Sequence, residues 1–255
     1  WHNQTPTELF RSAYAKSGAY LDKASMEERM DSYIGSVIEL IHEKWPGMLI
    51  AMDVVNEAVD DGTGKARATG SEWHEVFGDE SYVMKAFASA RKHTVALGET
   101  QMKLYYNDYN TSYPAKADGI VRLCRPIFEA GYLDGIGMQE HDRLDFPDAK
   151  AWIASYDKFY PICSEMSVTE MDVSTGASKA SAELLAMQAR QYAALFTCFV
   201  ERSARSGKGK IVNVSKDGLN DAYALYPDQS TSLWDSNYQC KSAFFAVVET
   251  AKSGR

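Results

Sequence analysis

The chain has 255 residues, of which 45% are hydrophobic and 24% are charged, and its formal net charge is −8 at pH 7. This length is enough for one α/β barrel or for two smaller domains. The excess of 35 acidic over 27 basic residues argues against nucleic-acid partners and anionic membranes, because both select a basic face. The sequence also lacks an apolar run of about 18 residues, so no membrane-spanning helix is predicted.

The first regular element predicted by the sequence is a helix. Residues 1–24 show no regular period of apolar side chains. Ser25 and Glu28 have the spacing of a capping box, which marks the start of a helix. The apolar side chains that follow share one helical face as far as residues 45–47.

The next segment, residues 48–55, is predicted to be a strand. Its run of apolar side chains is typical of a strand that is covered on both faces. The run ends abruptly in Asn56 and Glu57. An amide and a carboxyl group therefore stand at the carboxyl end of this strand.

Strand and helix patterns alternate through the rest of the chain. The further predicted strands cover residues 102–106, 133–139, 163–173 and 210–215. The further predicted helices cover residues 80–97, a segment that ends near 130, and residues 149–160, 180–202 and 239–250. This alternation predicts a parallel sheet. No G-x-G-x-x-G motif follows a strand, which disfavours a nucleotide-binding open sheet, and no shift in composition marks a linker.

The predicted strand over 163–173 carries Glu170 near its end, as the strand over 48–55 carries Glu57. Glycoside cleavage needs a carboxyl group that protonates the leaving oxygen and a carboxylate that attacks the anomeric carbon or activates water. In a β/α barrel the residues that follow the strands meet at one face. Glu57 and Glu170 are therefore candidate catalytic residues, and the alternative is that each only pairs with a Lys or Arg at a strand end.

Other polar side chains stand at comparable strand ends. Asn56 offers an amide to a sugar hydroxyl, and His141 is placed to orient or charge-tune a neighbouring carboxylate, unless it is an ordinary loop histidine. The further candidates for sugar binding are His2, Gln4, Asn107 and Gln139.

Five motifs occur in order along the chain. They are Trp1-His2-Asn3-Gln4-Thr5-Pro6, Asp53-Val54-Val55-Asn56-Glu57-Ala58, Tyr106-Asn107-Asp108-Tyr109-Asn110, Gly135-Ile136-Gly137-Met138-Gln139-Glu140-His141 and Val168-Thr169-Glu170-Met171-Asp172-Val173. Together they resemble glycoside hydrolase family 10, the endo-β-1,4-xylanases.

The resemblance implies a (β/α)8 TIM barrel that hydrolyses β-1,4-xylan with retention of configuration. In the family pattern Glu57 is the acid/base and Glu170 is the nucleophile. Asn56 contacts the 2-hydroxyl of the sugar, His141 bonds the nucleophile and keeps it ionised, and His2 and Gln139 line the same subsite. The resemblance implies no metal and no organic cofactor, xylan or xylo-oligosaccharides as partners, and a secreted location.

The sequence departs from the family pattern at two places. The family's opening strands are absent, so residues 1–255 are expected to form a single catalytic domain that runs from the end of the third barrel strand through the eighth strand and the final helix. Other domains of a longer chain are therefore expected as partners. Asp217 and Leu225 stand where the family has tryptophans, which predicts weaker sugar stacking at the cleavage subsite. Two alternatives stay open: a related retaining β-glycanase that acts on another plant polysaccharide, and a catalytically weakened carbohydrate-binding relative.

Overall fold

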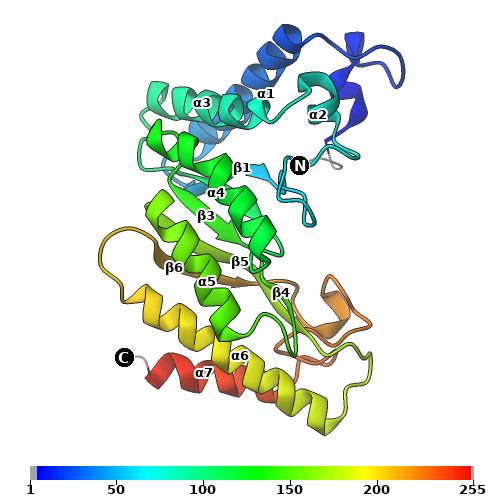
Figure 1. Cartoon of the computed structure of the whole chain (residues 1–255), viewed down its shortest axis with the longest axis vertical. Helices are drawn as coiled ribbons and strands as arrows, with labels where there is room; N and C mark the ends of the chain where they lie inside the picture. The colour runs from blue at the N-terminus through cyan, green and yellow to red at the C-terminus, as the bar shows by residue number, and fades with distance from the viewer. Residues whose placement is uncertain (1–4, 254–255) are drawn as a thin grey trace. The chain divides into compact units, whose positions relative to one another are not determined.

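The computed structural model describes residues 5–253 (Figure 1). These residues divide into two compact units. Unit 1 comprises residues 5–108 and 115–136, and unit 2 comprises residues 109–114 and 137–253. Both units alternate parallel strands with helices, which is the pattern of the (β/α)8 barrel class. The prediction of one catalytic domain over residues 1–255 stays a prediction.

Unit 1 contains the first two strands and the start of the third. Its elements are the 3-10 helices η1 (Thr7–Phe10) and η2 (Ser12–Tyr14), the helices α1 (Lys23–Lys44), α2 (Glu72–Phe77), α3 (Ser81–Ala96) and α4 (Pro114–Glu129), and the strands β1 (Ala51–Asn56), β2 (Lys103–Asp108) and the beginning of β3 (Gly135–Met138). The strand order is β1-β2-β3. The helix α1 packs along α3, as Figure 1 shows.

The parallel register of β1 and β2 places Asn56 opposite Asn107. A register shift between Asp53 and Val55 adds a residue to β1 relative to β2. Such irregularities re-aim the side chains that follow them. The end of β1, where Asn56 lies, is thus set by its pairing with β2.

The sequence predicts a strand at 48–55 that is covered on both faces. The observed strand starts later, and the prediction of cover on both faces is wrong. β1 begins at Ala51, Ile50 is 76% exposed, and Val55 is the one buried residue within the strand. Among the described residues, β1 is the end strand of the sheet order and pairs with β2. A largely apolar cavity of about 590 Å³ opens beside Val54 and Val55.

The start of α1 also differs from the prediction. The helix begins at Lys23, and its N-cap is Asp22, whose carboxylate accepts a hydrogen bond from the Ser25 backbone N–H over 2.9 Å. Ser25 and Glu28 therefore lie inside the helix and do not form the predicted capping box. An aspartate is as good an N-cap as a serine, and here it stands three residues earlier.

Unit 2 is built around a long central strand, β5. Its elements are the end of β3, the strands β4 (His141–Arg143), β5 (Glu165–Ser174) and β6 (Lys210–Lys216), the helices α5 (Ala149–Phe159), α6 (Ala182–Ser203) and α7 (Ser242–Ser253), and the 3-10 helices η3 (Tyr160–Ile162) and η4 (Asp221–Tyr223). β3 and β4 neighbour β5, and β6 also pairs with it. The helices α6 and α7 pack against each other (Figure 1). The strand β4 and the helix α2 were not predicted, because three and six residues are too few to show a period.

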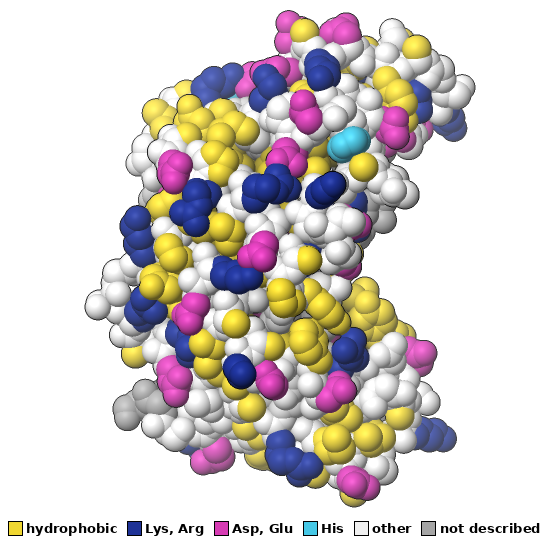
Figure 2. Space-filling view, in the orientation of Figure 1, with side chains coloured by type: hydrophobic (Ala, Val, Ile, Leu, Met, Phe, Trp, Pro, Cys, Tyr) yellow, Lys and Arg dark blue, Asp and Glu magenta, His cyan; other side chains and the backbone are white. Residues whose placement is uncertain are grey.

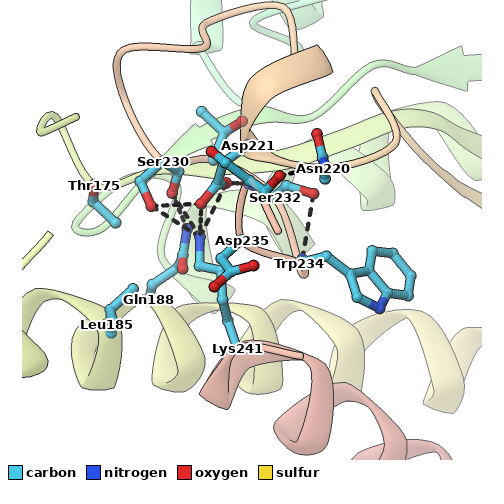
Figure 3. A network of polar contacts seen from close by, with 12 residues as sticks. Thr175, Leu185, Gln188, Asn220, Asp221, Ser230, Ser232, Trp234, Asp235 and Lys241 are labelled. Carbon is cyan, nitrogen blue, oxygen red and sulfur yellow. Dashed lines mark hydrogen bonds and ion pairs between the residues drawn. The ribbon is translucent and has the colours of Figure 1, made fainter. Parts of the chain in front are cut away.

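The loop that follows β6 is fixed by a buried ion pair (Figure 3). The Lys241 ammonium contacts the two carboxylate oxygens of Asp221 over 3.2 and 3.1 Å. It also donates to the backbone and side-chain oxygens of Ser230 over 3.0 and 3.1 Å. The Asp221 carboxylate in turn accepts the Ser232 backbone N–H over 2.8 Å. Two segments of the loop are thereby tied to the start of α7.

Basic and acidic side chains are interspersed on the face of the molecule in Figure 2. Among residues 5–253, no helix combines the length and the apolar composition needed to cross a bilayer.

Candidate active site

Glu57 follows β1 in a conformation that its neighbours enforce. Its φ is 58°, in the left-handed region that non-glycine residues rarely adopt. Its backbone N–H donates to the carbonyl of Asn107 over 2.9 Å, and Arg67 Nε donates to its carbonyl oxygen over 3.1 Å. The Glu57 side chain is 7% exposed. A residue that costs backbone strain and is held from both sides is a candidate functional residue.

A chain of amides orients the Glu57 carboxylate. Asn107 Nδ2 donates to Asn56 Oδ1 over 3.1 Å, and Asn56 Nδ2 donates to Glu57 Oε1 over 3.2 Å. The first bond fixes which end of the Asn56 amide is the donor, because an amide oxygen cannot donate. The three polar residues predicted at the ends of these two strands are thus brought together.

A buried ion pair supports this turn. The Tyr106 hydroxyl accepts the Ala58 backbone N–H over 3.1 Å and donates to Asp108 Oδ2 over 2.5 Å. Lys116 Nζ lies 2.8 Å from Asp108 Oδ1, and both of these side chains are fully buried. Lys116 Nζ also donates to the Val59 carbonyl over 2.7 Å. Burial raises the pKa of Tyr106 well above its usual value, so the phenol stays protonated and can donate.

In unit 2, His141 contacts two carboxylates at once. Its Nε2 lies 3.2 Å from Glu170 Oε2, and its Nδ1 lies 3.3 Å from Asp172 Oδ2. The β4–β5 register places His141 opposite Asp172. Glu170 and Asp172 are two residues apart on β5 and so share a face of the strand. The imidazole bridges them.

These contacts set the charge of His141. Burial lowers the pKa of the imidazole, but the hydrogen bonds that its ring N–H groups donate to Asp172 and Glu170 outweigh burial and raise the pKa to about 10. Burial raises the pKa of Asp172, and His141 opposes that rise. His141 is therefore a cation at neutral pH and faces the Glu170 carboxylate with a positive charge.

The other predicted site residues have different outcomes. Gln139 is 3% exposed, and its carbonyl accepts the Glu170 backbone N–H over 3.2 Å. His2 and Gln4 lie outside the described residues. The structure thus describes one group of predicted residues in unit 1, formed by Asn56, Glu57 and Asn107, and one in unit 2, formed by Gln139, His141 and Glu170.

Four residues that support the site were not predicted from the sequence. They are Tyr106, Asp108, Lys116 and Asp172. Asp172 could have been found from its spacing, because it lies two residues after Glu170 on the same strand face. Lys116 could have been found only from the fold, because its partner is contributed by a different element.

One cluster of metal-type side chains occurs in the described part of the chain. Single ligand atoms of His141, Asp172 and Asp217 lie within 4.8 Å of one another. The two ring nitrogens of His141 already contact the carboxylates of Asp172 and Glu170. We assign no metal to it.

Comparison with known proteins identifies the family of the chain. The model of the family "Glycosyl hydrolase family 10" matches residues 1–250. A curated relative named endo-1,4-beta-xylanase Y, from Acetivibrio thermocellus, is 35% identical over 97% of this chain. The chain spans 24% of the length of that relative.

Two solved structures are similar to the chain. One contains the CBM22-1 and GH10 modules of Clostridium thermocellum endo-1,4-beta-D-xylanase 10B in complex with xylohexaose, with a TM-score of 0.89, 35% identity, and coverage of 98% of this chain and 50% of that one. The other is an intracellular xylanase from Thermoanaerobacterium saccharolyticum, with a TM-score of 0.84, 30% identity, and coverage of 97% of this chain and 72% of that one. The family match covers more than nine-tenths of the sequence, and the chain belongs to glycosyl hydrolase family 10.

Proposed function

We propose that the protein containing this chain is an endo-1,4-β-xylanase that cleaves xylan with retention of configuration, through Glu57 and Glu170. The observation that carries the proposal is the contact between the cationic His141 and the Glu170 carboxylate, at 3.2 Å. A nearby cation stabilises a carboxylate in its ionised form. A nucleophile needs that form, so Glu170 takes the nucleophilic role.

The proposed reaction has two steps. The Glu170 carboxylate attacks the anomeric carbon while the Glu57 carboxyl group donates its proton to the glycosidic oxygen, and the bond to the leaving sugar breaks. A glycosyl ester on Glu170 results. The Glu57 carboxylate then accepts a proton from water, the resulting hydroxide displaces Glu170 at the same carbon, and the configuration is retained.

The polar neighbours have supporting roles in this proposal. Asn56 donates to Glu57 and binds the 2-hydroxyl of the sugar, and Asn107 orients Asn56. Asp172 holds His141 from its far side. Gln139, His2 and Gln4 are proposed as further sugar-binding residues.

The substrate class follows from the relatives. One relative is named as an endo-1,4-beta-xylanase, and one similar structure holds xylohexaose. Xylan or xylo-oligosaccharides are therefore the proposed partners, together with further domains of a longer chain. Export from the cell is also proposed, because xylan is an extracellular polymer, and recovery of the protein from culture medium tests this.

The decisive experiment follows the anomeric configuration of the first product by proton NMR during hydrolysis of xylohexaose. Retention supports the double displacement, and inversion would exclude it. Two matched isosteric variants, Glu57→Gln and Glu170→Gln, should each lower kcat by at least about 10³-fold. A substrate panel with xylan and mixed-linkage glucan separates the xylanase from another β-glycanase.

A further inference from the structure

Two acidic residues on either side of His141 are buried against each other. Glu140 is 3% exposed and Asp142 is 6% exposed, and their carboxyl groups are hydrogen-bonded to each other. Glu140 Oε1 also accepts the Thr111 hydroxyl over 3.1 Å and the Trp152 indole N–H over 3.2 Å. Both of these partners are neutral donors.

The charged groups around the pair do not neutralise two carboxylates. Arg143 carries the nearest guanidinium along the chain, but its side chain is 60% exposed and lies 3.7 Å from Asp145. The His141 charge lowers the pKa of Glu140 but does not outweigh burial, because both ring nitrogens contact carboxylates of β5, and Asp172 adds negative charge beside Asp142. Tyr192 of α6 interacts electrostatically with Asp142, and burial keeps that phenol neutral by raising its pKa well above the usual value.

Two buried carboxylates in contact cannot both be ionised without a cation, because burial and mutual repulsion both disfavour the second charge. Burial raises the pKa of Glu140 to about 7 and that of Asp142 well above its usual value. Asp142 Oδ2 is buried and has no hydrogen-bond donor among the described residues. A carbonyl oxygen of a protonated acid tolerates this position far better than a carboxylate oxygen does.

We infer that Glu140 and Asp142 share one proton and act as a positioning pair for His141, the residue between them. This role rests on the proposed function, since His141 contacts the proposed nucleophile Glu170. Asp142 follows His141 within β4, so the two side chains point to opposite faces of that strand. The carboxyl groups of Glu140 and Asp142 are buried, and the His141 ring contacts Glu170 and Asp172 of β5.

The strained backbone of Glu140 depends on the hydrogen bonds of its side chain. Glu140 has φ of 57°, a strained value for a residue with a side chain. Its carbonyl accepts the Asp172 backbone N–H over 3.1 Å. The hydrogen bond from Asp142 and those from Thr111 and Trp152 hold the side chain in this conformation. Loss of the shared proton would release the residue that precedes His141.

The first test measures thermal unfolding between pH 5 and 9 and needs no substrate. An acid with a raised folded-state pKa stabilises the fold while it is protonated, and this stability is lost as pH rises through that pKa. Asp142→Asn keeps the donor and cannot ionise. Over this range the Tm of the native protein should fall by about 5 °C more than that of the variant. Asp145→Asn, an exposed residue of the following loop, is the matched control and should track the native protein.

The second test measures kcat and KM on xylohexaose. Asp142→Ala should lower kcat by about tenfold and leave KM within about twofold, because misplacing His141 affects the reacting centre more than sugar binding. Asp142→Asn should recover most of kcat, since its amide can donate to Glu140.

If the Tm of the native protein and that of Asp142→Asn fall by the same amount between pH 5 and 9, Glu140 and Asp142 do not share a proton. Equal losses of kcat in the Ala and Asn variants would overturn the positioning role. If the protein cleaves no glycan, the proposed function fails, whereas the unfolding curves still decide whether the pair shares a proton.

Discussion

The side-chain amide of Asn107 donates to the side-chain oxygen of Asn56 over 3.1 Å, from the position directly opposite in the β1–β2 register. This bond determines that the NH2 group of Asn56 faces Glu57. One of the two asparagines therefore touches the proposed acid/base, and the other orients its neighbour.

Replacement of Asn107 by Asp should weaken catalysis without removing a catalytic residue. The new carboxylate would face the Asn56 oxygen, favour a flip of that amide, and break the bond to Glu57. The cost of one such hydrogen bond is about 1 to 2 kcal/mol, so kcat/KM on xylohexaose should fall by about tenfold. Asn213→Asp on β6, where Asn213 donates to Ser167 and Ser215, is the matched control. An unchanged kcat/KM for Asn107→Asp would contradict the orienting role.

The bridge made by His141 should make stability depend on pH. The pKa of His141 is raised from 6.5 to about 10 in the folded state. The stability that it contributes is therefore fully present below pH 6.5 and is lost as pH rises toward 10. His141→Gln should lower the free energy of unfolding by a few kcal/mol at pH 6, since one pKa unit corresponds to about 1.4 kcal/mol.

At pH 10 the difference between His141→Gln and the native protein should be smaller. Urea unfolding at both pH values measures it. His74→Gln in α2 changes the same residue type away from both groups of site residues and serves as the control. A difference that stays constant from pH 6 to pH 10 would show that His141 does not gain its charge from folding.

The sequence predicts the alternation of strands and helices well and predicts burial poorly at one strand. Most predicted elements lie within a few residues of the observed ones, as with β5, which runs from Glu165 to Ser174. The apolar composition of residues 48–55 predicts two covered faces, but cover depends on neighbours that a strand's own sequence does not specify. The exposure of Ile50 therefore could not be read from the sequence.

The residues that support the Glu57 turn could not be predicted from local sequence either. The predicted strand ends single out Glu57, His141 and Glu170, because the carboxyl ends of parallel strands meet at one edge of a sheet. Lys116 lies in a helix and contacts Asp108 at the end of β2. Nothing in the local pattern joins them, since contacts between distant elements depend on register and packing.

The Lys116–Asp108 ion pair should be costly to break from one side. Lys116→Met would leave Asp108 buried without its cation, and such losses cost about 3 to 5 kcal/mol. Chemical denaturation should show this loss, and activity should also fall because Asp108 anchors the Tyr106 hydroxyl beneath the Glu57 turn. Lys92→Met removes an ammonium that is 58% exposed from its pair with Asp31 and should cost less than about 1 kcal/mol. Equal effects of the two variants would refute the buried role of Lys116.

The ion pair of Asp221 and Lys241 should behave differently when both partners are replaced. Lys241→Met alone should cost about 3 kcal/mol or more, because it leaves a buried carboxylate unpaired. Replacing both members of a buried pair by apolar residues often restores stability. In this protein the double variant Asp221→Leu/Lys241→Met should not regain stability. Asp221 also accepts the Ser232 backbone N–H and the Ser230 hydroxyl. The double variant leaves both of these donors buried without an acceptor. A matched variant, Asp221→Asn/Lys241→Met, keeps an acceptor for Ser232 and should be the more stable of the two by about 1 kcal/mol or more in urea unfolding. If the Leu variant is instead as stable as the native protein, the loop after β6 does not depend on the network in Figure 3.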